Sequence, residues 1–404
     1  MNNRLPKLFI LFSVMLDSMG IGLILPVMPD LIQELEAGDL GQAAVWGGIL
    51  TTIFALMQFG FGPTVGGLSD RYGRRPVLLI ALVVMAFDYV LMAVAGTIWL
   101  LVVGRIIGGI TAATQSTAAA YMADISAPED KSANFGLIGA AFGVGFVLGP
   151  LMGGILAEYG TRAPFWAAAF LAAANAVFGY FALPETVTDR IRRPFSLARA
   201  NPLGAFKHIN QLPGLGRLMT MTFIYAIAFF VYPSIWAYFG KLQFGWGPGM
   251  IGLSLGLFGI GIAIVQGVLI RPIIRWMGER NAVLFGLGVD VIAFVGLGFV
   301  TNGWIALALT PLTAIGSVAG PALQGIMSRR AADDQQGELQ GALTSINAVA
   351  SIVAPLVMTQ TFFYFTHENA SVFLPGAPFL LSAVLVVGAI VVYLPLRRDL
   401  KSSG

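Results

Sequence analysis

The chain has 404 residues, of which 57% are apolar and only 11% are charged, and its mean hydropathy is +0.82. A water-soluble domain carries about 25% charged residues, so this composition excludes an ordinary soluble protein. The absence of cysteine excludes disulfides, thiol catalysis and Cys-ligated zinc. His208 and His367 lie outside the apolar runs, so we expect no metal held by the protein alone. The basic residues are scattered through short loops, so no nucleic-acid partner is expected.

Apolar runs of membrane-spanning length follow one another along the whole chain. A spanning helix needs about 20 mostly apolar residues, and these runs are uniformly apolar rather than alternating, which excludes a β-barrel. The runs cover 6–30, 44–65, 76–96, 98–122, 134–157, 163–183, 216–239, 248–270, 281–300, 304–327, 338–363 and 373–396. They predict an all-α membrane protein with twelve transmembrane helices.

The longest polar stretch divides these runs into two groups of six. It predicts an N-terminal half over 1–183, a cytoplasmic linker over 184–215 and a C-terminal half over 216–404. Twenty of the 23 Lys and Arg residues fall on the side that holds both termini. The positive-inside rule makes that side cytoplasmic.

The two halves repeat at a fixed spacing. Adding 205 carries Gly73 onto Gly278 and Pro150 onto Pro355. Such an offset indicates an internal repeat, and two parallel, pseudo-symmetric six-helix halves suit alternating access around a central site.

Four ionisable residues lie at mid-helix depth: Asp17, Asp88, Arg105 and Asp290. Each costs about 2.5–3.5 kcal/mol to insert, so each should face a partner or a hydrated cavity. One base cannot neutralise three acids, so at least one carboxyl must be hydrated or protonated, as proton coupling requires. An internal ion pair that only fixes the packing is the alternative. From similar depth and opposite sign, we expect Asp17 to pair with Arg105.

The short loop between the second and third runs reads GGLSDRYGRRP, and it carries the residues of a predicted cytoplasmic gate. Asp70 and Arg74 are one helical turn apart, Arg71 lies between them, and Asp124 ends the fourth run on the same side. These residues could form a cluster that holds the cytoplasmic ends in one state. A solvated loop is the alternative.

Glycines recur at four-residue spacing in the fifth run, at 139 and 143 and at 145, 149 and 153, and Pro150 bends the helix. This pattern favours close packing between helices of the two halves on the extracellular side. An ordinary kinked packing helix is the alternative.

Polar and aromatic residues inside the runs are candidates for cargo contact, although each alone is equally consistent with an interhelical contact. They are Gln58, Gln115, Asn175, Gln266, Gln324 and Asn347, with Phe87, Tyr89, Trp236 and Phe258 as aromatic walls.

These motifs together resemble the major facilitator superfamily over the full length. GGLSDRYGRRP looks like its motif A, GRIIGG its motif B, and GAAFGVGFVLGPLMGG the motif C of antiporters. LDSMGIGLILPVMP, ALMQFGFGP and PALQG look like the tetracycline-resistance efflux pumps.

The resemblance implies a monomeric drug/proton antiporter of the bacterial inner membrane and no enzyme. Its cargo would be a small-molecule drug, tetracycline, chelated to a divalent metal such as Mg²⁺, with no tightly bound cofactor. Asp17, Asp88, Arg105 and Asp290 fall on the family's intramembrane charges. Ile262 stands where well-known tetracycline pumps carry a histidine, which leaves a multidrug or metabolite exporter as the alternative.

Overall fold

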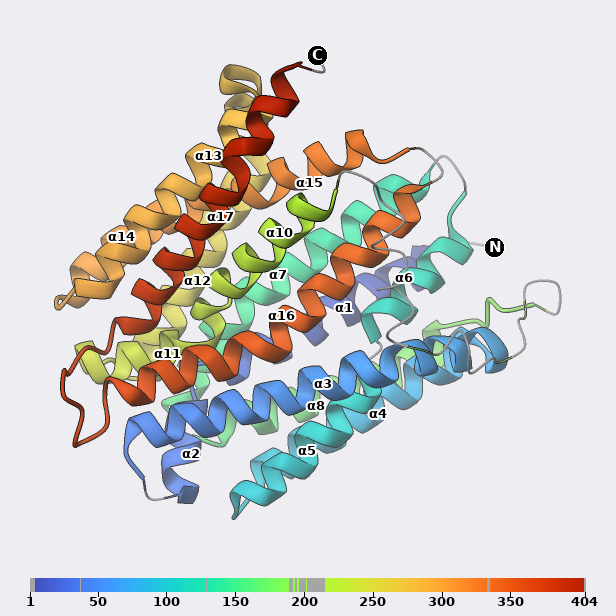
Figure 1. Cartoon of the computed structure of the whole chain (residues 1–404). Coiled ribbons are helices and arrows are strands. Elements are labelled where there is room, and N and C mark those ends of the chain that lie inside the picture. Colours follow the sequence, from blue (N-terminus) through green and yellow to red (C-terminus); the bar gives the residue numbers. More distant parts are fainter. Residues whose placement is uncertain are drawn as a thin grey trace. The chain divides into compact units, whose positions relative to one another are not determined.

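The computed structural model describes residues 4–36, 38–112, 114–127, 130–188, 192, 195, 201, 215–332 and 335–402, and all regular structure among them is helical. The first sequence half contains α1 (Arg4–Ile24), α2 (Met28–Glu36), α3 (Leu40–Tyr72), α4 (Arg74–Ala93), α5 (Ile98–Thr111), α6 (Thr114–Ile125), α7 (Lys131–Ala157) and α8 (Ala163–Ala182) (Figure 1). The second half contains α10 (Gly216–Phe229), α11 (Val231–Phe244), α12 (Pro248–Ile264), the π-helical turn η2 (Val265–Leu269), α13 (Ile270–Phe299), α14 (Gly303–Gly316), α15 (Ala319–Arg330), α16 (Gln336–Tyr364) and α17 (Ala377–Ser402).

Eleven helical stretches of the described chain are long and apolar enough to cross a membrane. One of them runs from Pro248 to Phe299, and its 52 residues would extend about 78 Å as a single helix, more than twice the hydrocarbon thickness. Gly278 breaks this stretch with a φ of 74°, so it makes two crossings. The prediction of twelve spanning helices is confirmed.

The breaks between helices recur at the predicted offset of 205. Gly73 (φ 115°) and Gly278 (φ 74°) both adopt the positive φ that favours glycine, and each directly precedes a new helix direction. The breaks between α5 and α6 and between α14 and α15 also correspond, as do the ends of α1 at Ile24 and α10 at Phe229. The internal repeat read from the sequence is therefore present in the backbone.

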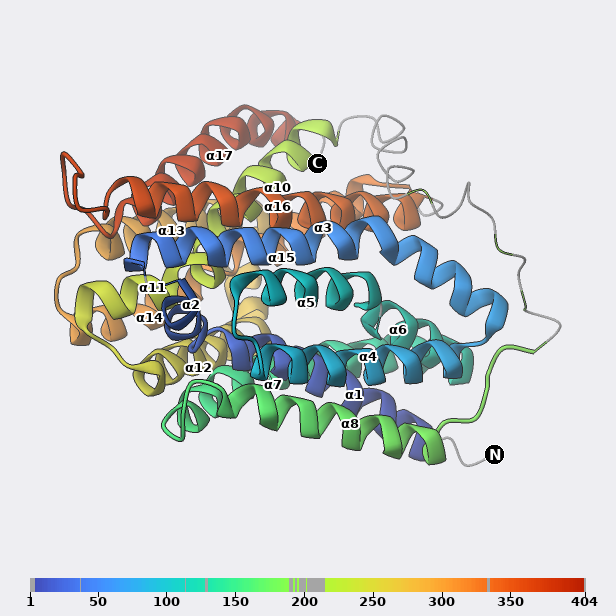
Figure 2. The ribbon, with the colours of Figure 1, turned by 90° about the horizontal axis from the view of Figure 1, so that it is seen from below.

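The first compact unit comprises Met1–Ala37, Ile53–Pro202 and Gly247–Gly256. In it α1 packs on α6, α7 and α8, while α4 packs on α5, α6 and α8 (Figure 2). Its core joins the first turns of α1 to α4, α6 and the end of α8, through residues such as Phe9, Leu78 and Tyr121. The first turns of α12 belong to this unit although they come from the second sequence half.

The second compact unit comprises Gly38–Thr52, Leu203–Trp246 and Leu257–Gly404. Here α10 packs on α16 and α17, and α13 packs on α14, α15 and α17. These neighbours are the repeat equivalents of those in the first unit. The beginning of α3 joins this unit, where the Thr52 hydroxyl donates to the Ile352 carbonyl at 2.9 Å.

The glycine faces of α7 pack differently from the prediction. Gly145, Gly149 and Gly153 lie directly against the backbone of α1, so this face closes a contact inside the N-terminal half and not one between the halves. An added Cβ at Gly154 would instead lie 2.7 Å from the Pro248 carbonyl at the start of α12. The glycines of α7 therefore allow close contact with two helices, three of them with α1 and one with α12.

Candidate functional site

The buried charges of the first unit form an ion pair between consecutive helices. Arg105 of α5 donates from Nη2 to Asp88 Oδ2 of α4 at 3.0 Å and lies 2.8 Å from Met92 Sδ. Its guanidinium also lies over the Phe54 ring, 5.2 Å from the centroid. Asp88 is 4% exposed, and its Oδ1 has no hydrogen-bond partner among the described residues. The pair therefore keeps one carboxylate oxygen available inside the protein.

Two glycines of the GRIIGG motif make the room that the Asp88 carboxylate occupies. A Cβ placed at Gly104 would lie 2.6 Å from Asp88 Oδ1, and one at Gly108 would lie 2.7 Å from Asp88 Oδ2. Real Cβ atoms do not approach oxygen so closely. The motif thus places its arginine and its two small residues around a single acid of the neighbouring helix.

We expect Gly104→Ala and Gly108→Ala each to displace the Asp88 carboxylate from Arg105. Overpacking of this kind costs about 1–3 kcal/mol, and transport activity should fall with it. Gly136→Ala and Gly139→Ala are matched controls, because no atom of the described residues lies within 4 Å of a Cβ at either position. Thermal unfolding in detergent and drug uptake into vesicles measure both effects; equal effects in all four variants would contradict the assignment.

The predicted pairing of Asp17 with Arg105 is wrong, because Arg105 pairs with Asp88. Asp17 is half-buried in α1, and among the described residues it takes part in no ion pair or hydrogen bond. Membrane depth and charge alone did not distinguish Asp17 from Asp88 as the partner of Arg105. The direction in which each side chain leaves its helix distinguishes them, because the Asp88 side chain points toward the glycines of α5.

Asp290 is a buried acid of the second unit, and it has no cationic partner among the described residues. Its side chain is fully buried on α13, and Oδ2 accepts a hydrogen bond from the Tyr225 hydroxyl of α10 at 3.0 Å. Within the described chain Oδ1 has no hydrogen-bond partner, and Gly316 of α14 leaves space for it. Tyr225 was not predicted, since a tyrosine in an apolar run carries little signal by itself.

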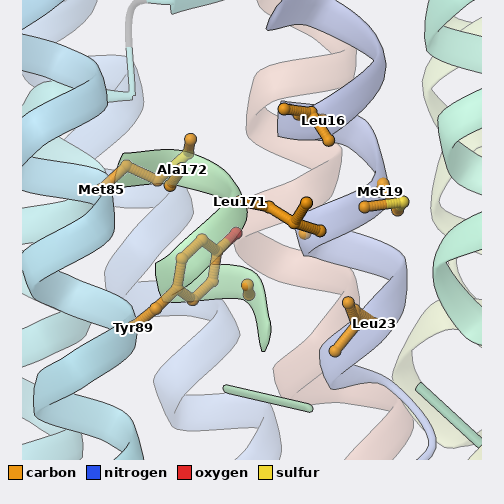
Figure 3. A pocket seen from close by; sticks show the side chains of 9 residues that line it. Leu16, Met19, Leu23, Met85, Tyr89, Leu171 and Ala172 are labelled. Carbon is orange, nitrogen blue, oxygen red and sulfur yellow. The ribbon is translucent and has the colours of Figure 1, made fainter. Parts of the chain in front are cut away.

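Tyr89 points into a small cavity between α1, α4 and α8 (Figure 3). Its hydroxyl lies where Gly20 leaves room on α1, within electrostatic range of Asp17 and Asp88. The cavity measures only about 10 Å³, whereas drug-sized ligands need pockets of about 300–1,000 Å³. This cavity is therefore too small for a drug, and the role of Tyr89 as an aromatic wall for cargo stays a prediction.

The other predicted cargo residues fall into three groups. The first group is exposed and contains Gln58, Gln266, Gln324 and Asn347. Of these, Gln58 donates a hydrogen bond to the Ala112 carbonyl at 3.1 Å, at the break between α5 and α6. Gln324 donates one to the Gln340 side chain at 3.3 Å. Trp236 and Phe258 are buried in an aromatic cluster around Tyr232. Asn175 is buried and donates to Ser13 at 2.9 Å, so it joins α8 to α1.

Phe87 lies apart from Asp88 on an exposed apolar stripe of α4. It is 59% exposed and shares this stripe with Ile80 and Val83, at helical spacing. Adjacent residues of a helix point about 100° apart, so Asp88 faces α5 while Phe87 faces outward. Phe87 therefore takes no part in the ion pair of Asp88 and Arg105, and its role as an aromatic wall for cargo stays a prediction. The side chain of Gln115 lies outside the described part of the chain.

The residues of the predicted cytoplasmic gate form an ion-pair cluster centred on Arg74. Its Nη1 contacts Asp70 Oδ1 at 2.5 Å, and its Nε donates to Asp124 Oδ2 at 3.3 Å. Arg71 is exposed, and its guanidinium lies 5.1 Å from the centre of the Tyr72 ring. Asp70, Arg74 and Asp124 are thus together as predicted, and Arg71 is beside the cluster.

Glu185, which the sequence did not single out, caps the helix that begins at the cluster. Its two carboxylate oxygens accept hydrogen bonds from the backbone N–H groups of Arg74 at 2.9 Å and Arg75 at 3.1 Å. Gly73 has no side chain to cap α4, and a Cβ there would meet the Glu185 carboxylate. The glycine before α4 was a signal in the sequence that another residue must cap this helix, because free N–H groups at a helix N-terminus favour an acid. Most of the predicted linker 184–215 lies outside the described residues, but its second residue is fixed to α4.

We expect Glu185→Ala to loosen the start of α4 and to cost about 0.5–2 kcal/mol of stability, the usual cost of removing a helix cap. Glu185→Gln should cost less, since one acceptor oxygen remains. Glu36→Ala, at an exposed acid in the last turn of α2, is the control. Hydrogen exchange of the backbone amides of Arg74 and Arg75 reports the cap directly, and unchanged protection in Glu185→Ala would refute it.

The second half carries the same three positions with every charge reversed. Adding 205 to Asp70, Arg74 and Asp124 gives Arg275, Glu279 and Arg329. Glu279 and Arg329 form an ion pair, as Arg74 and Asp124 do. The repeat has therefore kept the contact between the two helices while exchanging the signs of its partners.

Comparison with known proteins agrees with this architecture. The family model of the Major Facilitator Superfamily matches residues 10–355, which is most of the chain. The chain belongs to the major facilitator superfamily. It is accordingly a multi-pass membrane transporter and not an enzyme.

Curated relatives of this superfamily member cover nearly its whole length. It is 42% identical to the tetracycline resistance protein, class C, of Escherichia coli, over 89% of each chain. It is 35% identical to the class B protein of Escherichia coli over 86% of each chain. Among solved structures it resembles the nucleoside transporter NupG, with a TM-score of 0.77, 13% identity and coverage of 98% of this chain and 100% of that one. The human organic anion transporter MFSD10 gives a TM-score of 0.69 at 23% identity, covering 97% and 100%.

Proposed function

We propose that the protein exports tetracycline, as a chelate with a divalent metal such as Mg²⁺, in exchange for protons by alternating access. The named relatives at 35–42% identity support the cargo. The observation that carries the proposal is the set of three acids inside apolar helices, of which only Asp88 has a cationic partner in the described chain. Asp17 and Asp290 are neutral only when they bind a proton.

The charged residues inside the helices and those at the cytoplasmic ends of the helices have distinct roles. Asp17, Asp88, Arg105 and Asp290 take part in proton coupling. The cluster of Asp70, Arg74 and Asp124 gates the cytoplasmic side, where the excess of Lys and Arg puts both termini. The location proposed is the inner membrane of a bacterium, with the protein acting as a monomer.

Ile262 supports a second candidate, the export of a different amphipathic drug or metabolite in exchange for protons. It lies in α12, one turn before the exposed Gln266 of η2. A histidine at this position would offer a metal ligand or a proton site, and isoleucine offers neither. The difference affects the choice of cargo and leaves the acids of the coupling mechanism in place.

Uptake of tetracycline into inverted vesicles under an imposed pH gradient tests the proposal. We expect accumulation that depends on Mg²⁺ and collapses when a protonophore is added. Accumulation of unrelated cationic dyes without tetracycline would favour the second candidate. A lack of proton-driven accumulation of any amphipathic compound would reject both.

A further inference from the structure

A groove on the surface of the first unit lies outside the charged site described above. It has a volume of about 480 Å³, and the described residues that line it are apolar side chains of three helices. α7 contributes Ala141 and Val144, α8 contributes Phe178, and α1 contributes Leu8, Leu11, Phe12 and Met15. Leu8 is 61% and Phe12 is 42% exposed, so the groove opens to the surroundings of the helices.

The groove follows the first turns of α1 at the depth of one membrane leaflet. Leu8 and Met15 are seven residues apart, which corresponds to about 10 Å along the helix. One leaflet has about 15 Å of hydrocarbon, half of the bilayer core. At the same end, Phe178 of α8 packs against Phe9 of α1, with ring centroids 5.4 Å apart. The helices α1, α7 and α8 are mutual neighbours here (Figure 2).

Exposed aromatic side chains mark the membrane interface beside the groove. Tyr180 and Phe181 are 62% and 80% exposed in the last turn of α8, two and three residues after Phe178. Tyrosine in particular collects at the level of lipid headgroups. The groove therefore begins at the headgroup level and continues into the hydrocarbon.

Two basic residues lie at the headgroup end of the groove, on the same helix face as two of its lining residues. Arg4 is four residues before Leu8, and Lys7 is four residues before Leu11, a spacing that puts each base on the same helix face as a lining residue. Arg4 is exposed, and neither base forms an ion pair or hydrogen bond among the described residues. The apolar groove thus ends in positive charge that no acid of the described chain neutralises.

We propose that this groove binds one glycerophospholipid with an anionic headgroup, taken from the leaflet that surrounds the N-terminus. An acyl chain lies along Leu8 to Met15 between α7 and α8, and the phosphate accepts hydrogen bonds from Arg4 and Lys7. Juxtamembrane bases attract anionic lipid, and each contributes roughly a fivefold preference. The site is separate from the transport mechanism and does not depend on the identity of the cargo.

Native mass spectrometry of the full chain tests the proposal. The protein is released from nanodiscs that contain equal amounts of phosphatidylglycerol and phosphatidylcholine with matched acyl chains. We expect retained phosphatidylglycerol in the wild type and about fivefold less preference in Arg4→Gln. Arg217→Gln, at an exposed arginine at the start of α10, is the matched control and should keep the wild-type preference. Ala141→Phe fills the groove and should lower retention of both lipids. Equal retention of the two lipids by the wild type, or equal effects of Arg4→Gln and Arg217→Gln, would overturn the proposal.

A second measurement needs no variant. A phosphatidylglycerol with a photoreactive acyl chain should label the peptides that contain Phe12 and Val144 in the wild-type protein. Glycerol 3-phosphate, which has the charged phosphate without the chains, should not compete with this labelling. Equal labelling of the exposed stripe of α4 around Val83, or displacement by glycerol 3-phosphate, would show that the groove does not select the lipid.

Discussion

We expect Asp290→Asn to abolish drug accumulation driven by a pH gradient while leaving the helices folded. Asparagine has the same shape as the acid and accepts the hydrogen bond from Tyr225, so the buried site remains filled and bonded. It cannot gain or lose a proton in the transport cycle. The amount of drug in inverted vesicles should therefore fall to the level found without a gradient.

Exchange of labelled drug across the same vesicles, without a gradient, separates coupling from binding. This exchange should persist in Asp290→Asn, because the substitution removes the proton site and not the path of the cargo. Asp39→Asn is a suitable control, since Asp39 is a half-buried residue just before α3 whose side chain accepts a hydrogen bond from the Gln42 amide at 2.7 Å. Gradient-driven accumulation in Asp290→Asn would exclude this acid from proton coupling.

Arg105→Gln should be the most destabilising substitution at the ion pair. It leaves the 4% exposed carboxylate of Asp88 without its cation, and breaking a buried pair from one side costs about 3–5 kcal/mol. Low yield and a reduced unfolding temperature in detergent are the expected results. Arg162→Gln is a matched control, because that arginine pairs with Glu34 at 3.7 Å and is 36% exposed.

The double variant Asp88→Asn/Arg105→Gln distinguishes an unpaired charge from a general loss of packing. Removing both charges replaces the ion pair with two neutral amides, so most of the lost stability should return. Transport should remain defective, because the acid is absent. If the double variant were as unstable as Arg105→Gln alone, the pair would not account for the stability of these two helices.

The sequence was sufficient for the helices and the repeat because both depend on the order of residues along the chain. Run lengths gave the twelve crossings, and the offset between Gly73 and Gly278 gave the matching breaks. The ion pair depended on how α4 and α5 are rotated against each other. Asp17 and Asp88 have the same charge and similar depth, so the sequence alone did not identify the partner of Arg105.

Contacts between distant segments were also beyond what local patterns reveal. Glu185 follows the sixth apolar run and looks like the first acid of a solvated linker, yet it caps a helix that begins 111 residues earlier. Tyr225 is one aromatic residue among many in the apolar runs. Its importance arises from the fold, which brings α10 against α13 and its hydroxyl onto Asp290.

The pairing of Asp88 with Arg105 also bears on how the chain enters the membrane during synthesis. Each residue alone carries an insertion cost of about 2.5–3.5 kcal/mol. They lie on consecutive helices, only 17 residues apart and joined by a turn of a few residues. A translocation channel that releases α4 and α5 together, as a hairpin, lets each charge meet the other before either faces lipid. In the described part of the chain Asp290 has no cationic partner on a neighbouring helix. Its hydrogen-bonding partner Tyr225 lies on α10, which is synthesised before α13.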